Sequence, residues 1–105
     1  MTEANYIAAM PVGAVENGKA IVFNHDGASI LICNSNGQFF AIENKCSHAD
    51  EVLECGRIRN GWIACPAHGA RFDLASGAAM NPPAKDPIKT YHLRLSGETI
   101  EVAVG

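Results

Sequence analysis

Two short segments, each carrying one cysteine and one histidine, constrain this chain more than any other feature. The first is Cys46-Ser47-His48, the second is Cys65-Pro66-Ala67-His68, and residues 49–64 separate them. Thiolate and imidazole donors paired on two loops are the ligands of a soft transition-metal site. The sequence therefore predicts that Cys46, His48, Cys65 and His68 bind one metal centre.

Zinc is one candidate for this centre, since two cysteines and two histidines can complete a tetrahedral site. In common zinc sites, however, both cysteines lie on one turn and both histidines lie on a helix at wider spacing. Here each segment mixes the two. A mixed segment suits a dinuclear iron–sulfur centre, in which two cysteines hold one iron and two histidines hold the other. The pattern favours iron–sulfur and leaves a zinc-bound interaction module as the alternative.

The motif Cys-x-His, followed after sixteen residues by Cys-x-x-His and Gly69, resembles the Rieske [2Fe-2S] family. The resemblance covers almost the whole chain, and residues 62–74 with the following Ser76-Gly77 are similar to the second cluster loop of oxygenase-type Rieske proteins. It implies one [2Fe-2S] cluster per chain. High-potential members carry an extra disulfide between the loops, but Glu51 and Ala67 occupy those positions here. The chain therefore resembles the low-potential branch of Rieske-type ferredoxins and oxygenase domains.

The resemblance also assigns a role to each ligand. It implies that Cys46 and Cys65 bind the buried iron, whereas His48 and His68 bind the outer iron and expose their ring edges toward a partner. Two neutral imidazoles in place of two thiolates make such a cluster easier to reduce than a plant-type ferredoxin cluster.

Whole-chain properties limit the class of protein. A length of 105 residues predicts a single domain, 1–105. No apolar run approaches the ~20 residues of a membrane span, and the first residues do not resemble a signal peptide, so we expect a soluble cytoplasmic protein with no membrane partner. The net charge of −3 argues against binding to nucleic acid.

Turn signals separate short runs rich in Ile, Val, Phe and Tyr, and no segment has a sustained helical period. The predicted class is all-β: a Rieske-type antiparallel β-sandwich with an inserted cluster-binding subdomain at about 45–77. The expected strands are 6–10, 20–24, 29–33, 39–43, 57–59, 62–64, 71–73, 88–95 and 99–104.

The last two strands show the clearest alternation of apolar and polar residues. Their apolar faces are expected to meet in the core, one formed by Tyr91, Leu93 and Leu95 and the other by Ile100, Val102 and Val104.

The remaining cysteines and histidines match no ligand of the motif. We interpret Cys33 as a small apolar strand residue and Cys55 as a loop thiol, because their spacing does not resemble a four-cysteine ferredoxin. His25, expected in a turn, and His92, expected on a strand, are interpreted as structural or solvated.

Two further segments flank the predicted centre. Asp50, Glu51 and Glu54 make the rim of the first cluster loop acidic, either as a solvated loop or as a surface that steers a basic partner. The proline-rich segment 81–87 cannot form a central strand, so it is either a rigid connector or, by the resemblance, a lid beside the cluster.

Function follows from what a chain of this length can hold. It lacks room for a second domain with a mononuclear iron, and it has no Gly-x-Gly-x-x-Gly element for a flavin or nicotinamide. We therefore expect a monomeric electron carrier rather than an enzyme, which passes electrons from a flavin-containing NAD(P)H-dependent ferredoxin reductase to a terminal ring-hydroxylating dioxygenase. The alternative is a Rieske-like small subunit of an assimilatory nitrite reductase.

Overall fold

The strands of the molecule confirm the all-β prediction. A computed structural model describes residues 5–46, 52–66, 69–81 and 85–104. Its strands are β1 (Tyr6–Pro11), β2 (Ala20–His25), β3 (Ala28–Ser35), β4 (Gln38–Glu43), β5 (Arg57–Arg59), β6 (Trp62–Ala64), β7 (Arg71–Asp73), β8 (Thr90–Tyr91), β9 (Leu93–Ser96) and β10 (Thr99–Ala103). Within the described residues the only helical element is a 3-10 turn, η1 (Val12–Ala14), and no helix there could cross a membrane.

Two-residue hairpin turns form where the sequence places an Asn or Asp before a glycine. Asp26-Gly27 joins β2 to β3, Asn36-Gly37 joins β3 to β4, and Asn60-Gly61 joins β5 to β6. Both residues of each turn have positive φ, between 46° and 86°. This is the backbone conformation that matches the right-handed twist of paired strands, so these turns set the strand register locally.

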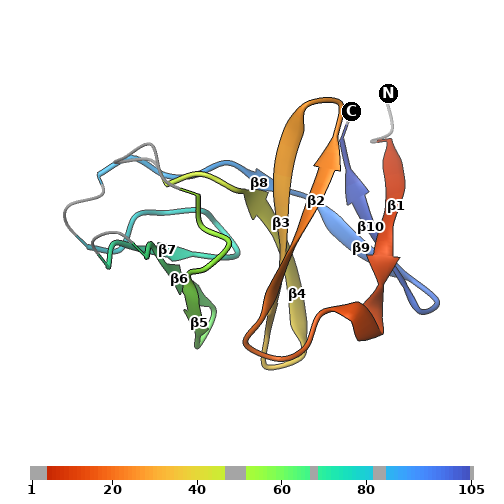
Figure 1. The fold of residues 1–105 in the computed structure, drawn as a ribbon, viewed down its shortest axis with the longest axis horizontal. Helices are drawn as coiled ribbons and strands as arrows, with labels where there is room; N and C mark the ends of the chain where they lie inside the picture. The colour runs from red at the N-terminus through yellow and green to blue at the C-terminus, as the bar shows by residue number, and fades with distance from the viewer. Residues whose placement is uncertain (1–4, 47–51, 67–68, 82–84, 105) are drawn as a thin grey trace.

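Three antiparallel sheets result (Figure 1). The first has the order β1-β10-β9 and the second β2-β3-β4-β8, and the two lie face to face as a sandwich. The third sheet, β5-β6-β7, lies beside the second and falls within the predicted subdomain at about 45–77.

The central strand β3 is buried on both faces, which explains its nearly continuous apolar sequence. Ile30 and Ile32 point into the sandwich core with Ile100 and Val102. The alternate residues, Leu31 and Cys33, belong to a second core. That core also contains Ile42 of β4 and the apolar side chains of the third sheet and its loops, which are Cys46, Leu53, Ile58, Ile63, Cys65, Ala70, Phe72 and Leu74. The third sheet is therefore packed against the outer face of the sandwich.

The predicted strand 88–95 is wrong in one respect, because the structure divides it between two sheets. β8 pairs with β4, whereas β9 pairs with β10. The change occurs at His92, which is exposed between the two strands and whose carbonyl accepts a hydrogen bond from the Ala103 N–H at 2.8 Å. The periodicity of side chains is the same in both strands, so the sequence pattern alone gives no sign of the break.

Leu95 also departs from the prediction that it lies in the core. Its side chain is 52% exposed, although Leu93 on the same face of β9 packs against the sandwich core. β9 is the edge strand of its sheet, so only one of its two sides is paired with a neighbouring strand. Ile100 and Val102 are buried and Val104 is partly buried, as predicted.

Candidate metal centre

Cys65 follows the last residue of β6 and begins the loop that leads to β7. Its N–H donates to the carbonyl of Ala70 at 2.7 Å, and its carbonyl accepts from the N–H of Gly69 at 3.0 Å. Gly69 has a φ of +73°, a conformation that a side chain disfavours. These bonds hold Cys65 against Gly69 and Ala70 at the base of the β6–β7 hairpin.

Cys46 lies on the other loop, three residues after β4 ends at Glu43. Cys46 is 0% exposed and Cys65 is 1% exposed, and both belong to the core between β3–β4 and the third sheet. Two thiols from separate loops, enclosed by apolar residues such as Leu53 and Phe72, form a dry and soft ligand pair. This arrangement fits the predicted binding of one buried iron by two cysteines. His48 and His68 lie outside the described residues.

A buried asparagine holds the base of the first loop. Asn44 is 6% exposed, and its Oδ1 accepts a hydrogen bond from the N–H of Leu53 at 2.8 Å, across the loop that contains Cys46. Its Nδ2 donates to the hydroxyl of Ser29 on β3 at 3.2 Å and to the carboxylate of Glu54 at 3.1 Å. One amide thus ties both ends of the loop to the sandwich. The sequence analysis did not identify Asn44, although its place between a strand end and a ligand cysteine was a usable signal.

A second asparagine plays the same part on the second loop. The Oδ1 of Asn81 accepts from the N–H of Arg71 at 2.7 Å, and its Nδ2 donates to the carbonyl of Gly69 at 3.5 Å. Residues 78–80 reach this position by pairing beside β7, where the N–H of Met80 donates to the carbonyl of Arg71 at 2.8 Å. Asn81 is the first residue of the proline-rich segment, whose residues 82–84 lie outside the description.

Two glycines allow the backbone to approach closely around the loops. A Cβ on Gly56 would lie 2.4 Å from the carbonyl oxygen of Ala64, the residue before Cys65. A Cβ on Gly77 would lie 2.2 Å from the carbonyl oxygen of Ile88, and Gly77 also has a φ of +79°. Backbone atoms cannot move away cheaply, so each site requires glycine. Gly56 brings the end of the first loop against the start of the second.

The structure confirms that Cys33 is a buried strand residue and that Cys55 is a loop thiol. Cys33 is fully buried in β3, and burial raises the pKa of its thiol to about 12. Cys55 is an exposed thiol in the turn before β5. His25 was expected in a turn but is the last residue of β2, where its ring stacks on Phe23 with the ring centroids 6.3 Å apart.

The acidic rim predicted from the sequence is only partly described. Asp50 and Glu51 lie outside the described residues. Glu54 is exposed, but its carboxylate accepts the hydrogen bond from Asn44. Glu54 therefore has a structural role that the sequence analysis did not assign to it.

Comparison with known proteins agrees with this geometry. The family model of the Rieske [2Fe-2S] domain matches residues 5–92. The chain is 34% identical to the ferredoxin component of biphenyl 2,3-dioxygenase from Rhodococcus jostii, over 86% of this chain and 84% of that protein. Its fold is similar to a ferredoxin from Sphingomonas yanoikuyae B1, with a TM-score of 0.89, 28% identity, and coverage of 96% of this chain and 100% of that one.

A more distant likeness concerns the fold alone. A protein described as a putative NADH-dependent nitrite reductase small subunit from Mycobacterium tuberculosis has a TM-score of 0.86 at 17% identity, covering 99% of this chain and 98% of that one. The match to the family model spans most of the chain and includes Cys46 and Cys65. Because the cofactor of this family is a [2Fe-2S] cluster, the match excludes the zinc-bound alternative. The chain belongs to the Rieske [2Fe-2S] domain family and binds one [2Fe-2S] cluster.

Proposed function

We propose that this protein is the ferredoxin component of an aromatic-ring-hydroxylating dioxygenase system. In this role it is an electron carrier rather than an enzyme: it receives single electrons from a flavin-containing NAD(P)H-dependent reductase and delivers them to the terminal oxygenase. The observation that carries the proposal is the 34% identity to a dioxygenase ferredoxin component over most of both chains. We further propose that it acts in the cytoplasm as a monomer.

The proposed ligands are Cys46 and Cys65 for one iron and His48 and His68 for the other. When bound, the cluster supplies reversible transfer of one electron. The chain contributes a site that changes little between the two oxidation states, because the loops carrying the cysteines are fastened to β-strands by backbone hydrogen bonds and by Asn44 and Asn81. The apolar core around both cysteines excludes water from the thiolates, and this exclusion is one of the factors that set the potential.

A nitrite reductase small subunit remains the second candidate, supported by the fold likeness described above. The two functions differ in how long the partner stays bound. A shuttle must dissociate after each electron, whereas a permanent subunit needs a large apolar interface. The candidates therefore differ in the oligomeric state of the isolated protein and in the partners that it reduces.

A coupled assay tests the function. The purified protein carrying its cluster is mixed with NADH, a flavin reductase and a terminal oxygenase of a biphenyl-type system, and product formation is followed with and without the ferredoxin. We expect product only when all three proteins are present, and a monomer on size-exclusion chromatography. Absence of electron transfer with these partners, together with stable association with a nitrite reductase large subunit, would support the second candidate.

Electron paramagnetic resonance of the reduced protein tests the ligand set. We expect a spectrum with nitrogen coupling from two histidines, which is lost when either His48 or His68 is replaced by alanine. Replacement of Cys33 by alanine is the control, because Cys33 lies in β3 and not on a ligand loop; it should leave the spectrum unchanged. An unchanged spectrum in the His48 or His68 variant would show that the proposed ligand is wrong.

A further inference from the structure

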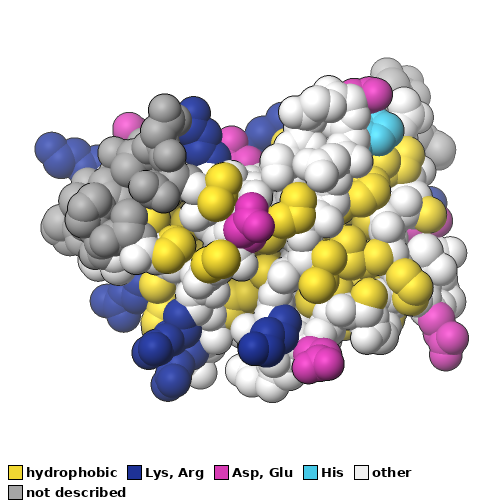
Figure 2. All heavy atoms as spheres, in the orientation of Figure 1, with side chains coloured by type: hydrophobic (Ala, Val, Ile, Leu, Met, Phe, Trp, Pro, Cys, Tyr) yellow, Lys and Arg dark blue, Asp and Glu magenta, His cyan; other side chains and the backbone are white. Residues whose placement is uncertain are grey.

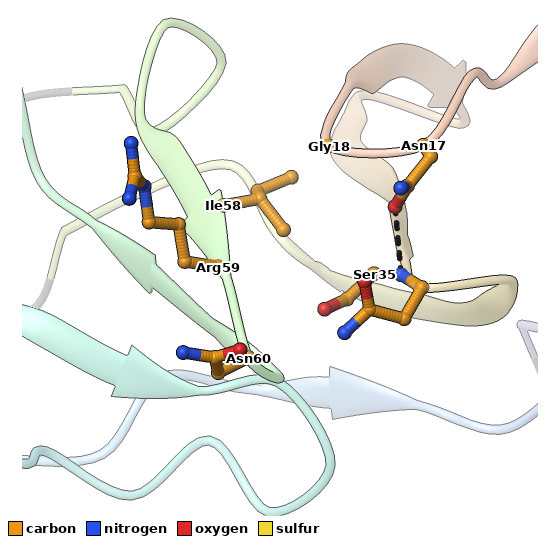
Figure 3. Close-up of a pocket in the computed structure, with 7 residues that line it drawn as sticks. Asn17, Gly18, Ser35, Ile58, Arg59 and Asn60 are labelled. Atoms are coloured by element: carbon orange, nitrogen blue, oxygen red, sulfur yellow. Dashed lines mark hydrogen bonds between the residues drawn. The ribbon is translucent and has the colours of Figure 1, made fainter.

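A cleft separates the third sheet from the end of the sandwich. One part, of about 260 Å³, is lined by residues that include Asn17, Ser35, Ile58 and Asn60. Figure 3 shows Ile58 pointing from β5 toward the wall that carries Asn17 and Ser35, while Arg59 points away from that wall. An adjoining hollow of about 420 Å³ continues along β5 and shares Gly18, Ile58 and Arg59 with the first.

Three cations surround the second hollow. Lys19 lies on the sandwich wall, and Arg57 and Arg59 lie on β5. We call these three residues the basic strip. Figure 2 shows dark-blue Lys and Arg side chains along the lower edge of the molecule, with magenta acidic side chains beside them, and further basic side chains along the upper left edge. The strip holds three of the eight Lys and Arg residues of a chain whose net charge is −3, so positive charge is concentrated here against the overall balance.

The cations of the basic strip are not engaged within the described part of the chain. Other cations have partners: Arg94 pairs with Glu101 and covers Tyr6, Arg71 covers Trp62, and Lys89 covers Tyr91. Lys19, Arg57 and Arg59 form no ion pair or ring contact with any described residue. The single carboxylate that lines the hollow, Glu54, already accepts a hydrogen bond from Asn44.

The backbone beneath the strip is held in place from both sides. On the sandwich wall, the N–H of Asn34 donates to the carbonyl of Lys19 at 3.1 Å, and the N–H of Gly18 donates to the carbonyl of Asn34 at 2.8 Å. On the other wall, the Asn60-Gly61 turn is tied to β3, since the N–H of Gly61 donates to the hydroxyl of Ser35 at 2.9 Å. Because the backbone is already held, a partner that binds the strip has to order only the side chains of Lys19, Arg57 and Arg59. The entropic cost of association is therefore lower than for a flexible loop.

The strip is also next to the proposed ligand loops. Arg57 pairs with Ala64, and the following residue is Cys65. A protein seated on the outward face of β5 would therefore contact the strand pair that carries one of the buried cysteines.

From these observations we infer that the basic strip is a docking surface for an acidic patch, a cluster of Asp and Glu side chains, on a redox partner. The inference rests on the proposed function and names the chemistry of its partner. Arginine binds carboxylates through two parallel hydrogen bonds, and exposed cations spread over two walls suit several carboxylates on a protein surface. Every buried side-chain N or O in the described residues already has a hydrogen-bond partner, so the cleft presents no buried donor that would single out a small anion.

Charge-neutralising variants with a matched control test the strip. The test variant combines Arg57→Gln with Arg59→Gln, and the control combines Lys89→Gln with Arg94→Gln. Each changes the net charge from −3 to −5, because each removes two cations. Reduction by the reductase and re-oxidation by the oxygenase are followed by stopped-flow absorbance as a function of ionic strength. Adding Lys19→Gln to the test variant probes the opposite wall.

At about 0.1 M salt, where the Debye length is about 10 Å and each charge acts only on its surroundings, we expect association with at least one of the two partners to slow about three-fold or more in the test variant. The control should change less than about two-fold, and the difference should vanish near 1 M salt, where the Debye length is about 3 Å. Equal rates in the test and control variants with both partners would overturn the inference. Unchanged spectra and thermal unfolding verify that both variants are folded with their cluster.

A second measurement separates failure of the strip from failure of the proposed function. Titration calorimetry with poly-L-glutamate at low salt needs no redox partner. We expect binding by the wild-type protein and the control, and at least five-fold weaker binding by the test variant. If the wild type fails to reduce the oxygenase yet this difference persists, the proposed function is wrong and the strip stands. If the wild-type protein reduces the oxygenase, but the test and control variants behave alike in both the kinetic and the titration experiments, the inference about the basic strip is wrong.

Discussion

Replacement of Asn44 by leucine should loosen the first cluster loop more than it disturbs the rest of the fold. The Asn44 side chain makes hydrogen bonds to the N–H of Leu53, the hydroxyl of Ser29 and the carboxylate of Glu54. Leucine has a similar size but can make none of them. Leu53 is 0% exposed, so its N–H would remain buried without an acceptor.

The magnitude follows from these contacts. An unsatisfied buried N–H costs about 1–3 kcal/mol, and the hydrogen bond to Ser29 adds about 1 kcal/mol. The contact with the exposed Glu54 adds little. We therefore expect Asn44→Leu to lower the free energy of unfolding by about 3 kcal/mol, out of a total of about 5–15 kcal/mol. Because the lost bonds span the loop that carries Cys46, the cluster should also be released faster to an iron chelator.

Asn34 of β3 supplies a matched control, because it is another buried asparagine whose side chain bonds to the backbone. It is 7% exposed, and its side chain donates to the carbonyl of Val15 at 2.8 Å and accepts from the N–H of Gly37 at 2.9 Å. Asn34→Leu should cost similar stability in urea unfolding without accelerating loss of the cluster absorbance. Equal rates of cluster loss in the two variants, once corrected for stability, would refute the specific role of Asn44.

A double variant that exchanges the donor and the acceptor tests the hydrogen bond between Asn44 and Glu54. Asn44→Asp keeps an acceptor for Leu53 but places a carboxylate against that of Glu54, where the amide donated at 3.1 Å. Adding Glu54→Gln restores a donor to this position, so the double variant should recover much of the stability that the single variant loses. Absence of any recovery would show that the Glu54 contact contributes nothing to the loop.

Three further predictions follow from the structure. Gly56→Ala places a Cβ 2.4 Å from the Ala64 carbonyl oxygen and should lower the free energy of unfolding in urea by about 1–3 kcal/mol. Gly13→Ala is the control, because its Cβ meets nothing within 4 Å and should change the free energy little. Equal effects of the two variants would contradict the packing argument. Burial raises the pKa of the Cys33 thiol from 9.0 to about 12, so the unfolded chain loses this proton at lower pH than the folded chain does. The free energy of unfolding should therefore fall by up to about 1.4 kcal/mol per pH unit between about pH 9 and 12. Cys33→Ala should show a shallower fall, and an identical slope in the two proteins would refute this reasoning. His68→Cys should either lose the cluster or lower its reduction potential, because a thiolate adds negative charge; voltammetry showing a higher potential with an intact cluster would contradict this electrostatic reasoning.

Much of the fold could be predicted because its signals are local. Asn-Gly and Asp-Gly pairs favour positive φ in successive residues, and the hairpins at Asn36 and Asn60 form where those pairs occur. The spacing of Cys46 and Cys65 relative to their histidines indicated an iron–sulfur centre, because ligand chemistry depends on residue type and order along the chain. The family and its cofactor were therefore accessible from the sequence.

Other features depend on which distant residues meet, and local patterns do not encode this. The alternation in 88–95 is uniform, yet the chain changes sheets at His92 because β4 and β10 offer separate edges to pair with. Nothing in the sequence indicated that Glu54 accepts a hydrogen bond from Asn44, because the two residues are ten positions apart. Lys19 lies near Arg57 and Arg59 only because the third sheet packs beside the sandwich. The sequence by itself predicted the ligands and determined the turns, since both depend on the chemistry of neighbouring residues. Tertiary packing decided how the loops are held and where Lys19, Arg57 and Arg59 come together, because those contacts join residues that are far apart along the chain.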